Sequence, residues 1–249
     1  MKLPLVCIAV MLAAPVAPAQ TPDYERLALA SLTKDDYVTA RRNLELALEN
    51  EKAPVKRVEL RRRIAALYVF DDELDEAREI YEALIDENIK AGKPAAAHDH
   101  YALATIAALE EDKHQIRKHL LAGDSAQPSP PYTPMLHAIV WGHVDEVGRV
   151  AKARADMEAA VEAQPTDSLA RQAVALTRSI YATKIRALDV ARAEAATISA
   201  PSMKAFATVF IANALRRDGQ RAAAADLDKE VRKFKQLNIY SAVAHRMIR

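Results

Sequence analysis

The stretch "KDDYVTARRNLELALEN", residues 34–50, is followed by a near-copy, "DDELDEAREIYEALIDEN", at residues 71–88. Superposition of the two places Ala40 on Ala77, an offset of 37 residues from position 40 to position 77. Self-similarity at a fixed period of this length indicates stacked supersecondary units, each too small to bury its own apolar face. The repeated stretch therefore decides the architecture of the chain.

A second helical pattern precedes each copy, so each unit reads as a pair of helices. The apolar and small residues of these preceding patterns are Tyr24, Leu27, Ala28 and Ser31 in the first unit and Arg61, Ile64, Ala65 and Tyr68 in the second. Ala28 and Ala40 take the small positions of the first pair, because only a small side chain lets two helix axes approach within about 8 Å. Ala65 and Ala77 are expected to do the same in the second pair.

This alternation of small and large residues resembles the tetratricopeptide repeat (TPR). Later segments match it through Leu103, Ala104, Ala107, Ile116 and Leu120, through Ala153, Met157, Ala160 and Pro165, through Ser179, Ala182, Leu188, Ala191 and Ala195, and through Ile211, Ala212, Leu215 and a turn at Asp218-Gly219. In the fourth pair Trp141 falls where a small residue is expected. Its first helix is therefore either shifted in register or irregular.

The resemblance implies an all-α fold, a right-handed α-α superhelix (solenoid) of about six TPR-like helix pairs. The segment after Gln236 is expected to form a C-terminal capping helix over the last apolar face. Residues 20–124 hold the N-terminal pairs, and residues 136–249 hold the C-terminal pairs and the cap. Between them, the proline-rich segment 125–135 is a stiff linker or an ordered crossing, since its prolines prevent a regular helix. A segment of this composition is also a conceivable ligand for another domain.

Composition supports this class and excludes others. The chain has 249 residues, 51% of them hydrophobic and only 5 of them Gly, which gives it a core and a helical preference. Lys plus Arg number 35 against 34 Asp plus Glu, so the protein is close to neutral. This balance provides no general attraction to nucleic acid or to an anionic membrane surface.

The N-terminus predicts export. Lys2, the apolar run 3–14 and the small residues at 17–19 resemble a secretory signal peptide, residues 1–19, cut after Ala19. The alternative is an uncleaved membrane anchor, but an apolar run of roughly a dozen residues is short of the ~20 that a span needs. We expect a periplasmic or secreted protein with no stable membrane insertion after cleavage. Cys7 leaves with the signal, so neither disulfides nor a thiol nucleophile are expected.

No catalytic residue, metal ligand or cofactor site is predicted. Serine nucleophile elbows, phosphate-binding glycine loops and paired zinc histidines on one helix face are missing from the sequence. His98 and His100 flank Asp99, but residues two apart on a helix point to different sides, which favours solvated positions near a helix start over zinc ligands. Chance pairs of carboxylates leave a glycosidase open, and an enzyme is the least favoured class.

The helical register selects residues for a partner. If Ala104 is the crossing position of the third pair, residues of three pairs project toward or beside the groove that the stacked units enclose: Arg62, Tyr101, Thr105, Asn213, Arg216 and Arg217. An Asn side chain can hydrogen-bond an extended backbone, and Arg binds carboxylates with two parallel donors. The resemblance adds that TPR proteins use groove amides and cations to bind peptides. We therefore expect a protein or peptide partner, for which an acidic segment is one suitable form.

The first hypothesis for function is an exported TPR-like protein–protein interaction scaffold that binds a peptide or protein partner in the cell envelope. The alternative is a structural subunit that self-associates through its end faces, because the ends of a solenoid are stacking surfaces.

Overall fold

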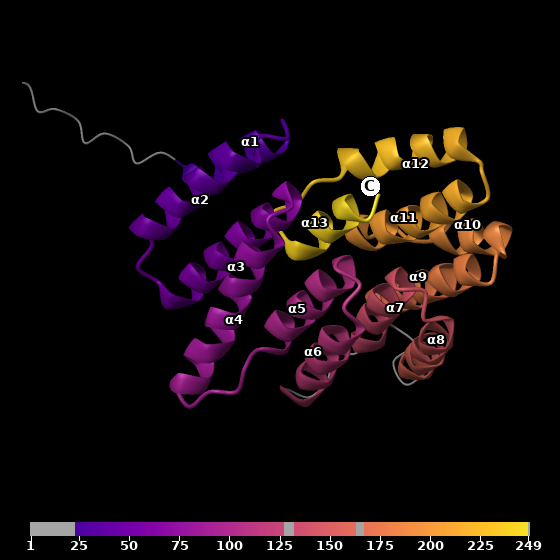
Figure 1. Ribbon diagram of the computed structural model, residues 1–249, viewed down its shortest axis with the longest axis horizontal. Coiled ribbons are helices and arrows are strands. Elements are labelled where there is room, and N and C mark those ends of the chain that lie inside the picture. Colours follow the sequence, from indigo (N-terminus) through magenta and orange to yellow (C-terminus); the bar gives the residue numbers. More distant parts are fainter. Residues whose placement is uncertain (1–22, 127–131, 163–166, 249) are drawn as a thin grey trace, which may run out of the picture.

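The computed structural model describes residues 23–126, 132–162 and 167–248, and all regular secondary structure within them is helical (Figure 1). Thirteen helices follow one another along these residues: α1 (Tyr24–Leu32), α2 (Tyr37–Asn50), α3 (Pro54–Asp71), α4 (Leu74–Lys90), α5 (Ala97–Leu109), α6 (Lys113–Ala126), α7 (Thr133–His143), α8 (Val147–Glu162), α9 (Ser168–Lys184), α10 (Leu188–Ala196), α11 (Pro201–Arg217), α12 (Arg221–Lys233) and α13 (Ile239–Arg246). The all-α class is therefore as predicted. The predicted signal peptide lies outside the described residues.

The first twelve helices form six adjacent packed pairs, α1 with α2 through α11 with α12. The turn inside each pair is the same. Each contains one residue with φ between 58° and 78°, and these residues are Asp35, Asp72, Glu111, Asp145, Arg186 and Gly219. The residue after it donates its backbone N–H to the carbonyl five positions earlier, over 2.8–3.1 Å, as Glu73 does to Tyr68. This is the left-handed helix end that satisfies otherwise unpaired carbonyl groups.

Buried residues keep a constant distance from these six turns. Seven positions before each turn residue lies a small side chain in the first helix, namely Ala28, Ala65, Ala104, Ala138, Ser179 and Ala212. Five positions after it lies a buried side chain in the second helix, namely Ala40, Ala77, Ile116, Val150, Ala191 and Ala224. All twelve are at most 1% exposed. The predicted helix pairs are thus confirmed, with small residues where the first helix meets its partner.

The fourth pair corrects the predicted register. Ala138 and Val150, rather than Trp141 and Ala153, take the two crossing positions set by the turn at Asp145. The error is three residues, which is close to one helical turn, so both registers place similar residues on the same face. The turn, which the sequence did not reveal, decides between them. The pair is therefore shifted and not irregular.

The predicted proline-rich linker, residues 125–135, is shorter in the structure. Helix α6 continues to Ala126 and α7 begins at Thr133, with Pro134 in its first turn, where the missing N–H of proline costs nothing. Residues 127–131 lie outside the described residues.

Helix α13 lies elsewhere than predicted. It packs chiefly on α3 and also on α5, α11 and α12, and Figure 1 shows it between α3 and α11. Its buried residues are Ile239, Ser241, Ala242, Val243 and Ala244. A helix that caps an end needs a polar outer face, whereas α13 is buried on most of its circumference. It therefore covers first helices from the second, third and sixth pairs instead of the last face alone.

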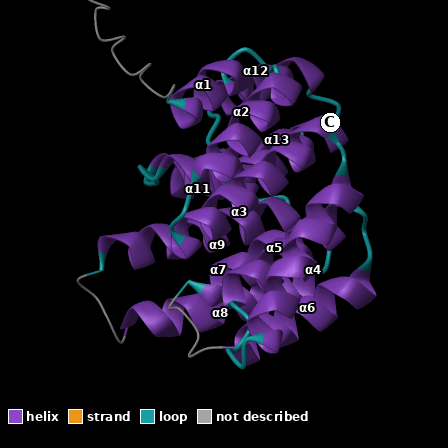
Figure 2. Ribbon diagram, turned by 90° about the vertical axis from the view of Figure 1, so that its left-hand side faces the viewer, coloured by secondary structure: helices purple, strands orange, loops and turns teal. Residues whose placement is uncertain are grey.

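Contacts at its C-terminal end join α13 to distant parts of the chain. The Arg246 guanidinium forms an ion pair with Asp72, the turn residue of the second pair. The Asn213 side chain on α11 donates a hydrogen bond of 3.1 Å to the Met247 carbonyl. Figure 2 shows the resulting stack, with α1 and α12 at one end and α6 and α8 at the other. Helix α13 therefore links an early pair directly to the last one.

Candidate functional site: two cavities beside the C-terminal helix

Two cavities flank the start of α13. The first, which we call the apolar cavity, has a volume of about 310 Å³ and lies among α5, α7, α9, α11 and α13. The second, which we call the polar groove, has a volume of about 560 Å³ and is bordered by α1, α3, α4, α5 and residues 236–239. His98 lines both. The consecutive residues Ile239 and Tyr240 line one each, so the first turn of α13 separates the two.

The walls of the apolar cavity come from the first helices of the last three pairs. Helix α7 contributes Leu136 and Ile139, α9 contributes Leu176, and α11 contributes Met203 and Phe206. All but Leu136 are buried. A mostly apolar concave site with a few polar groups is the usual form of a small-ligand site in proteins.

His98 and Tyr240 provide polar groups on the remaining side. Their rings meet edge to face, with centroids 6.0 Å apart. Burial raises the pKa of the Tyr240 hydroxyl, and burial together with the nearby Arg62 lowers the pKa of His98. Both side chains are thus neutral near pH 7, and neither hydrogen-bonds to another described residue. Tyr240 in particular keeps a proton that it can donate.

Tyr101, one of the predicted partner-binding residues, also lines the apolar cavity. Its hydroxyl donates to an Asp124 carboxylate oxygen at 3.0 Å and lies 3.3 Å from the Thr133 hydroxyl. Its ring lies against Gly123, where an added Cβ would come within 2.7 Å of the ring. Burial is the main cause that raises the pKa of Tyr101 to about 12. Tyr101 is therefore a wall residue whose polar end is already bonded within the chain.

The polar groove contains Arg62, the second predicted residue at a cavity. Its Nε and Nη2 atoms donate to the two carboxylate oxygens of Asp99 at 2.7 and 2.8 Å. Asp99 is 0% exposed, and the bond to it raises the pKa of Arg62. Parallel donors of this kind make a strong, oriented pair. The Arg62 Nη1 atom donates to no described residue, so one NH2 group of the guanidinium is left for a further acceptor.

Sequence reasoning missed Asp99, which it treated as solvated beside His98 and His100. Arg62 lies ten positions before the turn residue of its pair, Asp72, whereas Asp99 lies twelve positions before the turn residue of the next pair, Glu111. The residue equivalent to Arg62 in the third pair is therefore Tyr101 and not Asp99, so the period of the repeat gave no signal for this contact.

The two histidines of the third pair that do meet are His100 on α5 and His119 on α6. Their Nδ1 atoms lie 3.5 Å apart, and burial lowers the pKa of His119 to about 4. Across residues 23–126, 132–162 and 167–248 there is no group of three or more side chains placed to hold a metal ion. The histidine pair is therefore part of the packing between α5 and α6.

Thr105 and Asn213, also predicted to face a partner, have bonds within the chain. Thr105 is 1% exposed, and its hydroxyl donates to the Ala102 carbonyl. Asn213 donates to the Met247 carbonyl beyond α13. Neither residue lines the apolar cavity or the polar groove.

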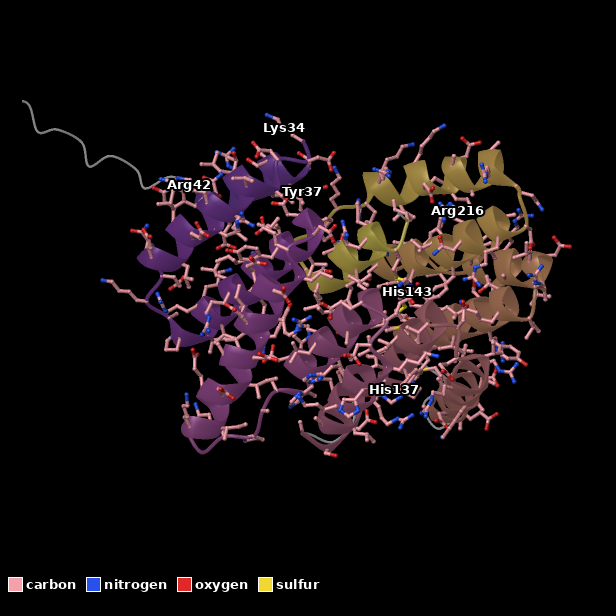
Figure 3. The ribbon with its side chains drawn as sticks, in the orientation of Figure 1. Lys34, Tyr37, Arg42, His137, His143 and Arg216 are labelled. Atoms are coloured by element: carbon pink, nitrogen blue, oxygen red, sulfur yellow. The ribbon has the colours of Figure 1, made fainter. Side chains whose placement is uncertain are left out.

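Arg216 and Arg217 point to different neighbours. Arg216 lies toward α12 (Figure 3), where its guanidinium pairs with Asp228 at 2.6 Å. Arg217 pairs with Asp145, the turn residue of the fourth pair, at 3.1 Å. The structure therefore brings Arg62 and Tyr101 to neighbouring cavities and leaves the predicted residues of the sixth pair outside both.

No protein-family profile matches the chain, and no curated protein sequence is similar to it. Within the part of the chain that the structure describes, none of the helices is long and apolar enough to cross a membrane. Fold and site together define the class as an all-α protein of packed helix pairs with two cavities on either side of its last helix.

Proposed function

We propose that this protein is an exported interaction scaffold, a right-handed superhelix of TPR-like pairs that binds a peptide segment of an envelope partner in the polar groove. The observation that carries the proposal is the groove itself, which is bordered by the first helices of the first three pairs and exposes part of the Arg62 guanidinium. The signal peptide predicted from the sequence supports export to the cell envelope.

The groove has the chemistry that an extended, partly acidic segment requires. Leu29 is 45% exposed on its wall and offers an apolar contact. Arg62 has a free Nη1 atom, and Arg63 beside it forms ion pairs with Glu25 and Glu59 that are partly open to solvent. A carboxylate of the partner could accept from Arg62 without displacing the buried Asp99. An acidic segment is therefore favoured over a basic one.

Site-specific photo-crosslinking tests the location. A benzoylphenylalanine introduced in place of Leu29 should form a covalent adduct in the native host, and mass spectrometry of the adduct identifies the partner peptide. Val55 on α3 is the matched control position, since it is 83% exposed and borders neither cavity. Absence of an adduct at position 29, or the same adduct at both positions, contradicts the proposal.

Affinity measurements with the identified peptide test the charge preference. Leu29→Glu should weaken binding roughly tenfold, about 1.4 kcal/mol, because it adds a negative charge and removes an apolar contact. Val55→Glu should bind like the wild type. The difference should shrink at high salt, because exposed charges are screened.

A second candidate function, self-association, is favoured by one observation. The first pair lies at an end of the stack and exposes Leu27 by 39% and Val38 by 61%. Exposed apolar residues on a terminal unit are a stacking surface. Light scattering that shows concentration-dependent oligomers, abolished by Val38→Glu, would support this candidate, and a monomer at all concentrations would reject it.

A further inference from the structure

Residues from the starts of two helices line the edge of the apolar cavity. Helices α5 and α11 both begin there, and neither has a side-chain N-cap, since Ala96 and Ala200 hold the cap positions. The backbone N–H groups of the cavity-lining residues His98, Ser202 and Met203 donate to no described residue. The first N–H groups of a helix have no partner inside the helix, so they are available to a ligand.

A third helix, α7, also begins at this cavity, and Tyr132 at its cap position makes no side-chain cap bond. The N-terminal end of each helix carries partial positive charge, which favours an anionic or acceptor group. Among the described residues that line the cavity there is no Asp, Glu, Lys or Arg. The helix starts therefore add positive potential at this edge, in addition to the nearby Arg62–Asp99 pair and the Asp124 carboxylate that bonds Tyr101.

A side-chain donor lies at the same cavity. The Tyr240 hydroxyl is neutral and makes no hydrogen bond to a described residue. Tyr240 is partly exposed, and a hydroxyl that has no partner inside the protein can donate to a ligand. Tyr240 thus adds an O–H donor to the free backbone N–H groups.

The opposite walls are apolar, as described for Leu136, Ile139, Leu176, Met203 and Phe206. A volume of about 310 Å³ holds roughly 10 non-hydrogen atoms, at the ~30 Å³ that one water-sized group occupies in a liquid. This is room for a short alkyl chain with one head group, and not for a folded peptide segment.

We propose that the apolar cavity binds a single-chain carboxylic acid of medium length. The carboxylate accepts hydrogen bonds from the helix starts and from Tyr240, and the alkyl chain packs against the walls of α7, α9 and α11. A carboxylate satisfies several donors at once because it has only acceptor sites. An ammonium head would face the positive ends of the helices with donors only. The site is separate from the polar groove and does not depend on peptide binding there.

Calorimetric titration of the full-length mature chain with octanoate, octylammonium and 1-octanol at pH 7.5 tests the head group. Octanoate should bind at least tenfold more tightly than octylammonium, with 1-octanol between them. Equal affinities, tighter binding of octylammonium, or no binding of octanoate would overturn the proposal.

Variants locate the ligand. Leu136→Trp fills the cavity from a partly exposed position and should abolish octanoate binding, whereas Leu169→Trp, on α9 and outside the cavity, should preserve it. Ser202→Phe is a second filling variant at the cavity edge, to be used if Leu136→Trp does not fold. Octanoate binding at wild-type strength by a folded filling variant would overturn the assignment.

The Tyr240→Phe variant tests the hydroxyl. It keeps the ring against His98 and should weaken octanoate roughly tenfold, the usual effect of one hydrogen bond to a charged group. It should leave 1-octanol, which can reach the helix starts as a neutral acceptor, less affected. An equal loss for both ligands would assign Tyr240 to the shape of the wall only and overturn its role as a donor.

Discussion

The apolar cavity and the polar groove are separated by one turn of α13, yet they are built from different chemistry. The groove side of α3 presents Arg62, Arg63 and Glu59, whereas the cavity side of α11 presents Met203 and Phe206. Both helices are first helices of equivalent pairs. The difference teaches that equivalent helices of different pairs can present different residues, and that these residues decide what each cavity can bind.

Helix α13 turns this difference into two separate sites. Ile239 closes the groove and Tyr240 closes the cavity, because neighbouring residues on a helix point about 100° apart. The pair formed by Arg62 and Asp99 holds α3 to α5 beside this division. Substitutions can disrupt this pair, the packing beyond the walls of the apolar cavity, or the exposed rim of the polar groove. We expect each to change the stability of the protein by a different amount.

The largest expected effect is that of Arg62→Ala. It leaves the carboxylate of Asp99 buried without its partner, and breaking such a pair destabilises a protein by roughly 3–5 kcal/mol. Urea unfolding followed by circular dichroism measures the loss. Arg61→Ala is the matched control, since Arg61 pairs with Glu87 nearer the surface and should cost less than about 1 kcal/mol. Equal losses for the two variants would mean that Asp99 is not buried.

The second effect is a loss of stability in acid. His119 on α6 packs against α5, and its pKa falls from 6.5 to about 4 on folding because burial disfavours the charged ring. Between these values the unfolded chain binds more protons than the folded one, so stability decreases as the pH falls from about 6.5 toward 4. The contribution of His119 is at most about 3 kcal/mol.

Melting temperatures at pH 7.5 and 4.5 test this assignment. His119→Gln should reduce the difference between the two, whereas the exposed His114→Gln should leave it unchanged. An undiminished difference in the His119 variant would assign the acid sensitivity to other groups.

The third effect concerns the packing of α7 against α9 and α11, beyond the residues that line the apolar cavity. Gly142 on α7 lies where an added Cβ would be 2.8 Å from Ile180 and 3.1 Å from Phe210. Gly142→Ala should therefore destabilise the protein by roughly 1–3 kcal/mol through overpacking. Gly148→Ala on α8 has open space and should be neutral or stabilise by up to ~1 kcal/mol, since it reduces the entropy of the unfolded chain. Thermal unfolding of both variants distinguishes them, and shifts of the same sign would contradict the packing described behind the cavity.

The smallest effect is on the rim of the polar groove. Leu29→Glu and Val55→Glu both change exposed positions and should alter the unfolding free energy by no more than about 0.5 kcal/mol. A larger loss for Leu29→Glu, measured by urea unfolding, would show that the groove wall contributes to stability and would disqualify the variant as a probe of binding alone.

Much of the fold was readable from particular residues. Ala40 and Ala77 identified the crossing positions of the first two pairs because a small residue lets paired helices approach closely, although Ile116 and Val150 hold this position in the third and fourth pairs. Most of the turns could not be predicted from the sequence, because five of the six left-handed positions hold Asp, Glu or Arg. Only Gly219 is the residue type that favours this conformation. Without the turns, the register of the fourth pair slipped by one helical turn.

Less of the candidate site could be predicted from the sequence. Arg62 and Tyr101 were placed near a groove by their register, and both line a cavity in the structure. Asn213, Arg216 and Arg217 were placed by the same reasoning and instead bond to other parts of the chain. The helical register predicts which side of its helix a residue faces. It does not predict which distant segment of the chain covers that side.

The sequence by itself determined the helices, their pairing and the period of the repeat, because those follow from local spacing and from side-chain size. Only the tertiary structure decided that α13 returns to lie on α3, α5 and α11, and that its first turn separates a polar groove from an apolar cavity. The physical reason is that α13 is apolar on most of its surface and can bury that surface in more than one place. The whole stack of pairs selects the place, through contacts such as Arg246 with Asp72 that join residues 174 positions apart.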